Sequence, residues 1–172
     1  MELALVADSH IPGRAKRIPQ PFVERIRTAD HVVHAGDFNS LSAYEAFREL
    51  APDLTAVPGN MDPSALPHPP VATLDIEGVT FVVTHGHGGR PDYEGYVAGV
   101  ARERAAGEPG DGNVVAVAGH THVVLDATVD GVRLLNPGSV TGAPPARRAT
   151  MMTAVVEDGD VDVTVHEADD GG

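Results

Sequence analysis

The side chains best suited to chemistry in this sequence are aspartate, asparagine and histidine residues that directly follow short apolar runs. Five such runs can be traced, at residues 3–7, 32–35, 54–58, 81–83 and 114–118. Behind them stand Asp8 and His10, Asp37, Asn60, His85 and His87, and His120 and His122. Carboxylate, amide and imidazole groups form a mixed oxygen and nitrogen set that suits Zn, Mn, Fe, Co or Ni. The pattern therefore predicts a site for divalent metal.

Each of these motifs also has an ordinary explanation when taken alone. Asp8 before Ser9 could cap a turn, and Gly59-Asn60 is a common turn dipeptide. Two histidines spaced like His120 and His122 would point to opposite faces of a regular strand. Because all the motifs occur together in one chain, the metal site is the better interpretation.

Alternating short elements in the first third of the chain would position the first of these residues. We expect strands at residues 3–7, 32–33 and 54–57, separated by helices at 21–29 and 42–50. Ser42-Ala43-Tyr44-Glu45 has the capping-box pattern that opens a helix. A β-α-β-α-β order implies parallel strands, and ligands in such sheets bind outside the carboxyl ends of the strands.

After Asn60 the pattern changes to antiparallel hairpins. We expect strand pairs at 71–76 and 79–84, at 123–129 and 132–135, and at 150–156 and 161–165. Glu77-Gly78, Asp130-Gly131 and Asp158-Gly159 would form their turns. A helix at 93–106 and a strand at 114–118 complete the order. The parallel start would supply much of one sheet, and the Asp-Gly hairpins much of a second sheet.

The composition narrows the class of protein. The chain has 172 residues, no cysteine, 25 acidic residues and 12 basic ones, of which only Lys16 is lysine. No disulfide scaffold or thiolate metal site can form, and such an acidic surface repels nucleic acid and anionic membranes. High acid content with almost no lysine favours a halophilic protein over an ordinary acidic one. Since residues 1–8 lack the basic and apolar regions of a signal peptide, we expect a cytoplasmic protein.

Taken together, the motifs resemble the signature of the calcineurin-like metallophosphoesterases. The matching segments are Asp8-x-His10, Gly36-Asp37, Gly59-Asn60, Thr84-His85-Gly86-His87 and Gly119-His120-Thr121-His122. The small, capless YfcE-like phosphodiesterases are the branch that the chain resembles most. The resemblance implies an α/β fold, a four-layer αββα sandwich of two facing sheets with helices outside. The chain would form a single domain over residues 1–172 without a cap. We expect a flexible acidic tail at 167–172.

The resemblance also implies a site for two divalent cations, with Mn favoured over Ni, Co, Fe and Zn. Asp8, His10, Asp37 and His122 would hold the first ion. Asp37, Asn60, His85 and His120 would hold the second, so that Asp37 bridges the pair. In two-metal hydrolases the ions lie about 3.5–4 Å apart, activate a bridging water and clamp the phosphoryl group. The expected reaction is hydrolysis of small phosphoesters, above all phosphodiesters.

Asp37, Asn60 and His87 are the expected catalytic residues. Larger relatives carry a histidine directly after the Gly-Asn pair, where this chain has Met61, and a thioether cannot donate a proton to a leaving group. His87 could take that role. The sequence leaves the roles of two further features undecided. His34 either supports the site or is an ordinary strand histidine. Residues 136–139 either lend hydrogen-bond donors or form a structural turn.

Two other functions compete with catalysis. A non-catalytic protein-binding scaffold like the retromer subunit Vps29 has the same fold but a degraded set of ligands. A purely structural metal would need a closed tetrahedral site. All seven ligand positions here hold competent side chains, which favours the enzyme. The expected partner is a small phosphoester substrate, with no nucleic acid or membrane, and relatives of this kind often form homodimers.

Overall fold

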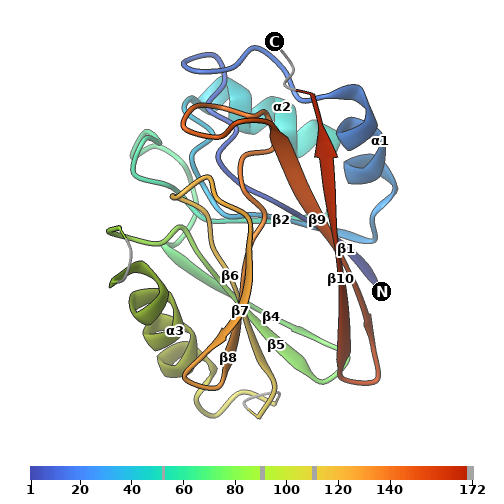
Figure 1. The fold of residues 1–172 in the computed structure, drawn as a ribbon, viewed down its shortest axis with the longest axis vertical. Helices are drawn as coiled ribbons and strands as arrows, with labels where there is room; N and C mark the ends of the chain where they lie inside the picture. The colour runs from blue at the N-terminus through green and yellow to red at the C-terminus, as the bar shows by residue number, and fades with distance from the viewer. Residues whose placement is uncertain (52, 90–91, 110–111, 170–172) are drawn as a thin grey trace.

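Two five-stranded sheets face one another in the computed structural model, which describes residues 1–51, 53–89, 92–109 and 112–169 (Figure 1). The first sheet has the strand order β10-β9-β1-β2-β3 and the second the order β4-β5-β6-β8-β7. Three helices accompany them within the described residues. Both sheets are mixed, since each combines parallel and antiparallel neighbours.

The parallel part of the first sheet follows the predicted alternation of strands and helices. It consists of β1 (Glu2–Val6), α1 (Gln20–Thr28), β2 (His31–His34), α2 (Leu41–Leu50) and β3 (Leu54–Ala56). The start of α2 differs from the capping-box prediction at Ser42. Ser40 is the N-cap, and its hydroxyl accepts a hydrogen bond from the Ala43 amide. The helix therefore begins one residue earlier, because Ser40 has the extended backbone that a cap requires.

The second sheet carries the remaining predicted strands and one helix. Its elements are β4 (Val71–Ile76), β5 (Val79–Thr84), α3 (Asp92–Ala105), β6 (Val114–Val117), β7 (Leu125–Val129) and β8 (Val132–Asn136). β5, β6 and β8 run parallel, whereas β4 and β7 are the antiparallel edge strands. The hairpin turns form as predicted, with Glu77, Gly78, Asp130 and Gly131 all at positive φ.

The last hairpin corrects one expectation from the sequence. β9 (Ala149–Glu157) and β10 (Asp160–Ala168) turn at Asp158-Gly159, yet they extend the first sheet rather than the second. β9 lies antiparallel to β1, with Leu3 opposite Ala154. β10 stays paired with β9 through Ala168, so no tail begins at residue 167. Residues 170–172 of the expected tail lie outside the described residues.

Three apolar layers hold the sandwich together. The largest lies between the sheets and includes Leu5, Phe81 and Val117. α1 and α2 pack on the outer face of the first sheet, while α3 covers the outer face of the second (Figure 1). This order of helix, sheet, sheet and helix confirms the predicted αββα arrangement. Among the described helices, none is long and apolar enough to cross a lipid bilayer.

Candidate metal centre

The seven predicted ligands come together where five strands end. Asp8 and His10 follow β1, Asp37 follows β2 and Asn60 follows β3. His85 directly follows β5, and His120 and His122 stand on the turn after β6. Their polar atoms form one continuous row of short distances, in the order His122, Asp8, His10, Asp37, His85, Asn60, His120. Both sheets therefore contribute to one site.

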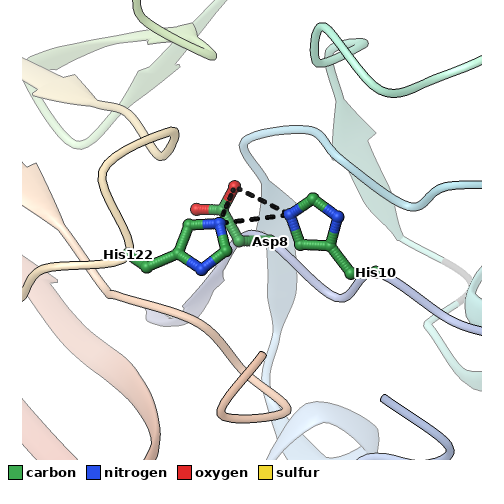
Figure 2. A group of neighbouring side chains, drawn as sticks. All are labelled: Asp8, His10 and His122. Carbon is green, nitrogen blue, oxygen red and sulfur yellow. Dashed lines mark hydrogen bonds and ion pairs between the residues drawn. The ribbon is translucent and has the colours of Figure 1, made fainter. Parts of the chain in front are cut away.

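One end of this row is the buried group of Asp8, His10 and His122 (Figure 2). The Nε2 atoms of the two histidines lie 3.1 Å apart, and Asp8 Oδ1 lies 3.4 Å from His122 Nε2. Asp8 Oδ1 is 3.8 Å from His10 Nε2. Three ligand atoms thus face a common point.

The tautomers of these histidines indicate that a cation belongs there. His122 Nδ1 donates to the Ala143 carbonyl at 2.8 Å, and His10 Nδ1 donates to Asn39 Oδ1 at 3.3 Å. A neutral imidazole carries one proton, so both Nε2 atoms present lone pairs to each other and to the Asp8 carboxylate. Lone pairs this close repel unless a positive charge lies between them. The donor set therefore fits a metal ion.

Asp37 lies between this group and the rest of the row. Its Oδ2 atom is 3.4 Å from His10 Nε2 and 3.3 Å from His85 Nε2. Asp8, Asp37 and His85 themselves form a second cluster of buried groups that could hold a metal ion. On the far side, Asn60 Oδ1 lies 3.0 Å from His85 Nε2 and 3.2 Å from His120 Nδ1. One carboxylate is thus within reach of ligands on both sides, as a bridging ligand must be.

Asp62 is a supporting residue that the sequence analysis passed over. Its carboxylate accepts backbone hydrogen bonds from Asp37 and Gly59 through Oδ2, at 2.9 and 2.8 Å, and from Asn39 through Oδ1 at 2.7 Å. These bonds join the turn after β2 to the turn after β3. In the sequence, its position two residues after Asn60 could have indicated that Asp62 supports the site. Outer contacts of this kind orient ligands.

A second set of contacts fixes the turn after β6. The Tyr93 hydroxyl donates to the Gly119 carbonyl at 2.7 Å, and Asn136 Nδ2 lies 2.9 Å from the same oxygen. Ser139 Oγ donates to the Asp8 carbonyl at 2.7 Å. Residues 136–139 therefore form a structural support for the site and lend no side chain to the row of ligands. Tyr93, on α3, was not predicted from the sequence.

The backbone carries strain at five of the predicted ligands. Asp8, His10, Asp37, His120 and His122 all have positive φ, between 46° and 73°. A non-glycine residue in this region costs about 1–3 kcal/mol and persists only where its surroundings enforce it, often at functional sites. Space is also short: a Cβ at Gly36 would lie 2.8 Å from His85 Nδ1 and 2.6 Å from the Gly59 amide. Glycine lets these turns approach closely enough to share a site.

Burial and charge act on the ligands in opposite directions. Burial alone would raise the pKa of Asp37, but the hydrogen bond and charge of His85 and the Met61 amide lower that pKa below its usual value. Burial likewise opposes the charge on His85, yet its hydrogen bond to Asp37 and the carboxylates of Asp8 and Asp37 raise its pKa. Both shifts favour the charged forms of this pair, and a cation bound between the two groups would take the place of a proton on His85.

His87 lies outside the row of ligands. It is exposed at the rim of a cavity of about 550 Å³ that Asn60, His85 and His120 also line. His34, whose role the sequence left open, is fully buried and braces the site. Its Nδ1 accepts from the Gly36 amide at 3.1 Å, and its Nε2 donates to Ser9 Oγ at 2.6 Å.

The comparisons agree with this geometry. Residues 1–159 match the model of the calcineurin-like phosphoesterase superfamily domain. A probable metallophosphoesterase of Methanothermobacter thermautotrophicus is 31% identical over 142 residues, covering 82% of this chain and 78% of that protein. Vacuolar protein sorting-associated protein 29 of Schizosaccharomyces pombe is 29% identical over 147 residues, covering 84% and 74%. Vps29 of Entamoeba histolytica, solved with Zn²⁺, has a TM-score of 0.75 at 24% identity and covers 97% and 99%. By its motifs, fold and family match, this chain belongs to the calcineurin-like phosphoesterase superfamily.

Proposed function

We propose that this chain is a phosphodiesterase that hydrolyses small phosphoesters with the help of two divalent metal ions. The observation that carries the proposal is the position of Asp37. Its Oδ2 atom lies within 3.4 Å of His10 Nε2 and 3.3 Å of His85 Nε2, between the two halves of the row of ligands. A site for one structural ion would need four ligands and no open position, and this row offers seven.

The ligands divide as the family resemblance implies. Asp8, His10, Asp37 and His122 would hold one ion, and Asp37, Asn60, His85 and His120 the other. When bound, the two ions would supply a hydroxide near neutral pH and neutralise the charge that develops on the phosphoryl group. The chain's own contribution is to fix the ligands: Nδ1 of His85 and of His122 each donate to a backbone carbonyl, which leaves Nε2 free to bind. Manganese remains the proposed metal.

His87 is the proposed proton donor to the leaving group. It is exposed at the rim of the cavity beside Asn60, His85 and His120, whereas Met61 stands where larger relatives have histidine. General acid catalysis typically contributes about 10²–10⁴-fold to a rate, and most for poor leaving groups.

The scaffold alternative draws on the Vps29 relatives, which share this fold. A protein that only binds partners has no need for strained ligands or for histidines held in one tautomer. The positive φ at five of the proposed ligands and the row of seven side chains support catalysis.

The substitution Asp37→Asn tests the proposal. It should abolish nearly all hydrolysis of an aryl phosphodiester in the presence of Mn²⁺, because the amide cannot supply the negative charge that holds two cations close. Calorimetric titration with Mn²⁺ should show that both binding events weaken, while the melting temperature of the metal-free protein shows that the variant folds.

Asp160→Asn is the matched control, since Asp160 is exposed at the start of β10. Its hydrolytic activity and its Mn²⁺ affinity should match those of the wild type. An Asp37→Asn variant with wild-type activity would overturn the two-metal proposal. A wild type that binds two ions yet hydrolyses no phosphoester would favour the scaffold.

A further inference from the structure

Among the described residues, Tyr96 is the one phenylalanine or tyrosine that is exposed. The sequence contains four phenylalanines, three tyrosines and no tryptophan. The other six aromatic side chains are at most 6% exposed, whereas Tyr96 is 47% exposed. Tyr96 is therefore the phenylalanine or tyrosine ring that a ligand could reach.

Tyr96 faces the candidate metal centre. It lines the cavity of about 550 Å³ together with three of the proposed ligands, Asn60, His85 and His120. Its ring lies 5.8 Å from that of His87 between centroids, at 65°, so the two rings form an aromatic corner. A group esterified to a phosphate at the metal centre would have this cavity directly beside it.

The helix that carries Tyr96 is held firmly. One turn earlier, Tyr93 is buried and donates its hydroxyl proton to the Gly119 carbonyl, next to the ligand His120. Gly95 and Gly99 lie on the same helix and carry no side chain that could cover the Tyr96 ring. The ring of Tyr96 thus stands on a helix that Tyr93 anchors to the turn of His120, which lowers the cost of ordering a ligand.

The cavity has the polarity of a site for a neutral ring. Pro58 and Pro70 add apolar surface, and Asn60 and Thr84 add uncharged polar groups. Among the described residues that line it, none is Asp, Glu, Lys or Arg. Apart from His85, His87 and His120, which the proposed function assigns to metal binding and proton transfer, the described lining offers no charge to a second phosphate or a carboxylate, whereas an aromatic group could stack on Tyr96.

We propose that this cavity is a subsite for an uncharged aromatic group of the substrate, such as a nucleobase or an aryl ring, with Tyr96 as its stacking platform. The inference rests on the proposed function, because the phosphate that carries the ring is taken to bind at the metal centre. It narrows the substrate to phosphoesters of aromatic or nucleoside alcohols.

Phenylphosphonate and methylphosphonate test the subsite without turnover, because neither contains an ester bond. Both are titrated calorimetrically into the Mn²⁺-loaded protein at a pH where both are dianions. The wild type should bind phenylphosphonate about fivefold more tightly than methylphosphonate, as expected for one aromatic contact. Tyr96→Ala should reduce this preference to less than about twofold and leave methylphosphonate affinity unchanged.

Two variants separate the ring from other effects. Tyr96→Phe should keep the wild-type preference, because the ring and not the hydroxyl provides the contact. Glu103→Ala, at an exposed position of the same helix, should also keep it. An equal preference in wild type and Tyr96→Ala would overturn the subsite while phosphonate binding itself upholds the metal centre. If neither phosphonate binds the Mn²⁺-loaded wild type, the result would contradict the proposed function and, with it, the subsite.

Discussion

Single residues in this site are held in protonation states or backbone conformations that an unfolded chain would not favour. His34 is the clearest case outside the ligands themselves. Its ring is stacked on Phe38 at 3.7 Å between centroids, and its two nitrogens bond to Ser9 and Gly36. Because Nδ1 accepts from an amide, the single proton sits on Nε2 and the ring is neutral. Burial, reinforced by the charge of His85, lowers the pKa of His34 to about 3.

This shifted pKa predicts a loss of stability in mild acid. An unfolded histidine takes up a proton near pH 6.5, whereas His34 in the folded protein stays neutral down to about pH 3. The unfolded state therefore binds more protons between these values, and the free energy of unfolding must fall as the pH falls through this window. The contribution is at most about 1.4 kcal/mol per pH unit. Urea unfolding of the metal-free protein at several pH values between 7.5 and 5 (about one unit either side of 6.5) measures it.

His34→Gln removes the titrating group and should make the pH dependence shallower by about one bound proton. Leu41→Gln serves as the comparison, because Leu41 is exposed and carries no titrating group. It should retain the wild-type slope. Identical slopes for the wild type and His34→Gln would show that His34 is protonated in the folded protein, contrary to its hydrogen bonds.

At the scale of elements, the site depends on turns that bond to each other as well as on strands. Asp62 connects the turns after β2 and β3 through three backbone amides. Asn136 and Tyr93 hold the turn after β6 from β8 and α3. Backbone strain at the ligands can persist because these contacts fix the turns from outside.

The substitution Asp62→Asn tests this support. An asparagine has one carbonyl oxygen where the carboxylate has two acceptors, so its amino group must face at least one backbone amide. Loss of a supporting contact of this kind typically lowers metal affinity by about 10–100-fold. We expect a loss of that size in Mn²⁺ affinity by calorimetry, with the fold retained in circular dichroism.

Asp30→Asn is a matched control at the opposite end of the strands, where Asp30 Oδ2 accepts a hydrogen bond from the Glu2 amide at 2.7 Å. Its Mn²⁺ affinity should stay at the wild-type level. If Asp62→Asn also binds Mn²⁺ as the wild type does, the turns are fixed by other contacts and Asp62 has no positioning role.

The same scale separates what the sequence could predict from what it could not. The meeting of the seven side chains was predictable because apolar runs mark buried strands and the polar residues after them stand at strand ends. The sheet to which β9 and β10 belong was not predictable, because an Asp-Gly turn indicates a hairpin but does not determine which other strand the hairpin pairs with. Ser40 and Ser42 are chemically alike, so only the backbone at Ser40 distinguishes the cap. Asp62 was overlooked because its three partners are backbone amides, which leave no trace in a side-chain pattern.

At the scale of the whole molecule, acidic residues outnumber basic residues by 25 to 12. The formal net charge is -13. Part of this charge gathers on the β9–β10 hairpin, where Glu157, Asp158, Asp160 and Asp162 line one hollow of about 300 Å³. Like charges around a concave surface reinforce one another and destabilise the folded state through self-repulsion. They also raise the local concentration of cations around the protein.

Salt should therefore stabilise this protein. The Debye length falls from about 10 Å at 0.1 M salt to about 3 Å at 1 M, so salt screens the repulsion between exposed carboxylates. We expect the melting temperature of the metal-free chain to rise as KCl increases from dilute to molar.

The triple variant Asp158→Asn, Asp160→Asn, Asp162→Asn should melt higher than the wild type in dilute buffer and respond less to KCl, since repulsion in the hollow is then already reduced. Asparagine also tolerates the positive φ of Asp158, so the turn should survive. A melting temperature that is flat or falling with KCl would mark an ordinary acidic protein. A triple variant with the full wild-type salt response would place the repulsion elsewhere on the surface.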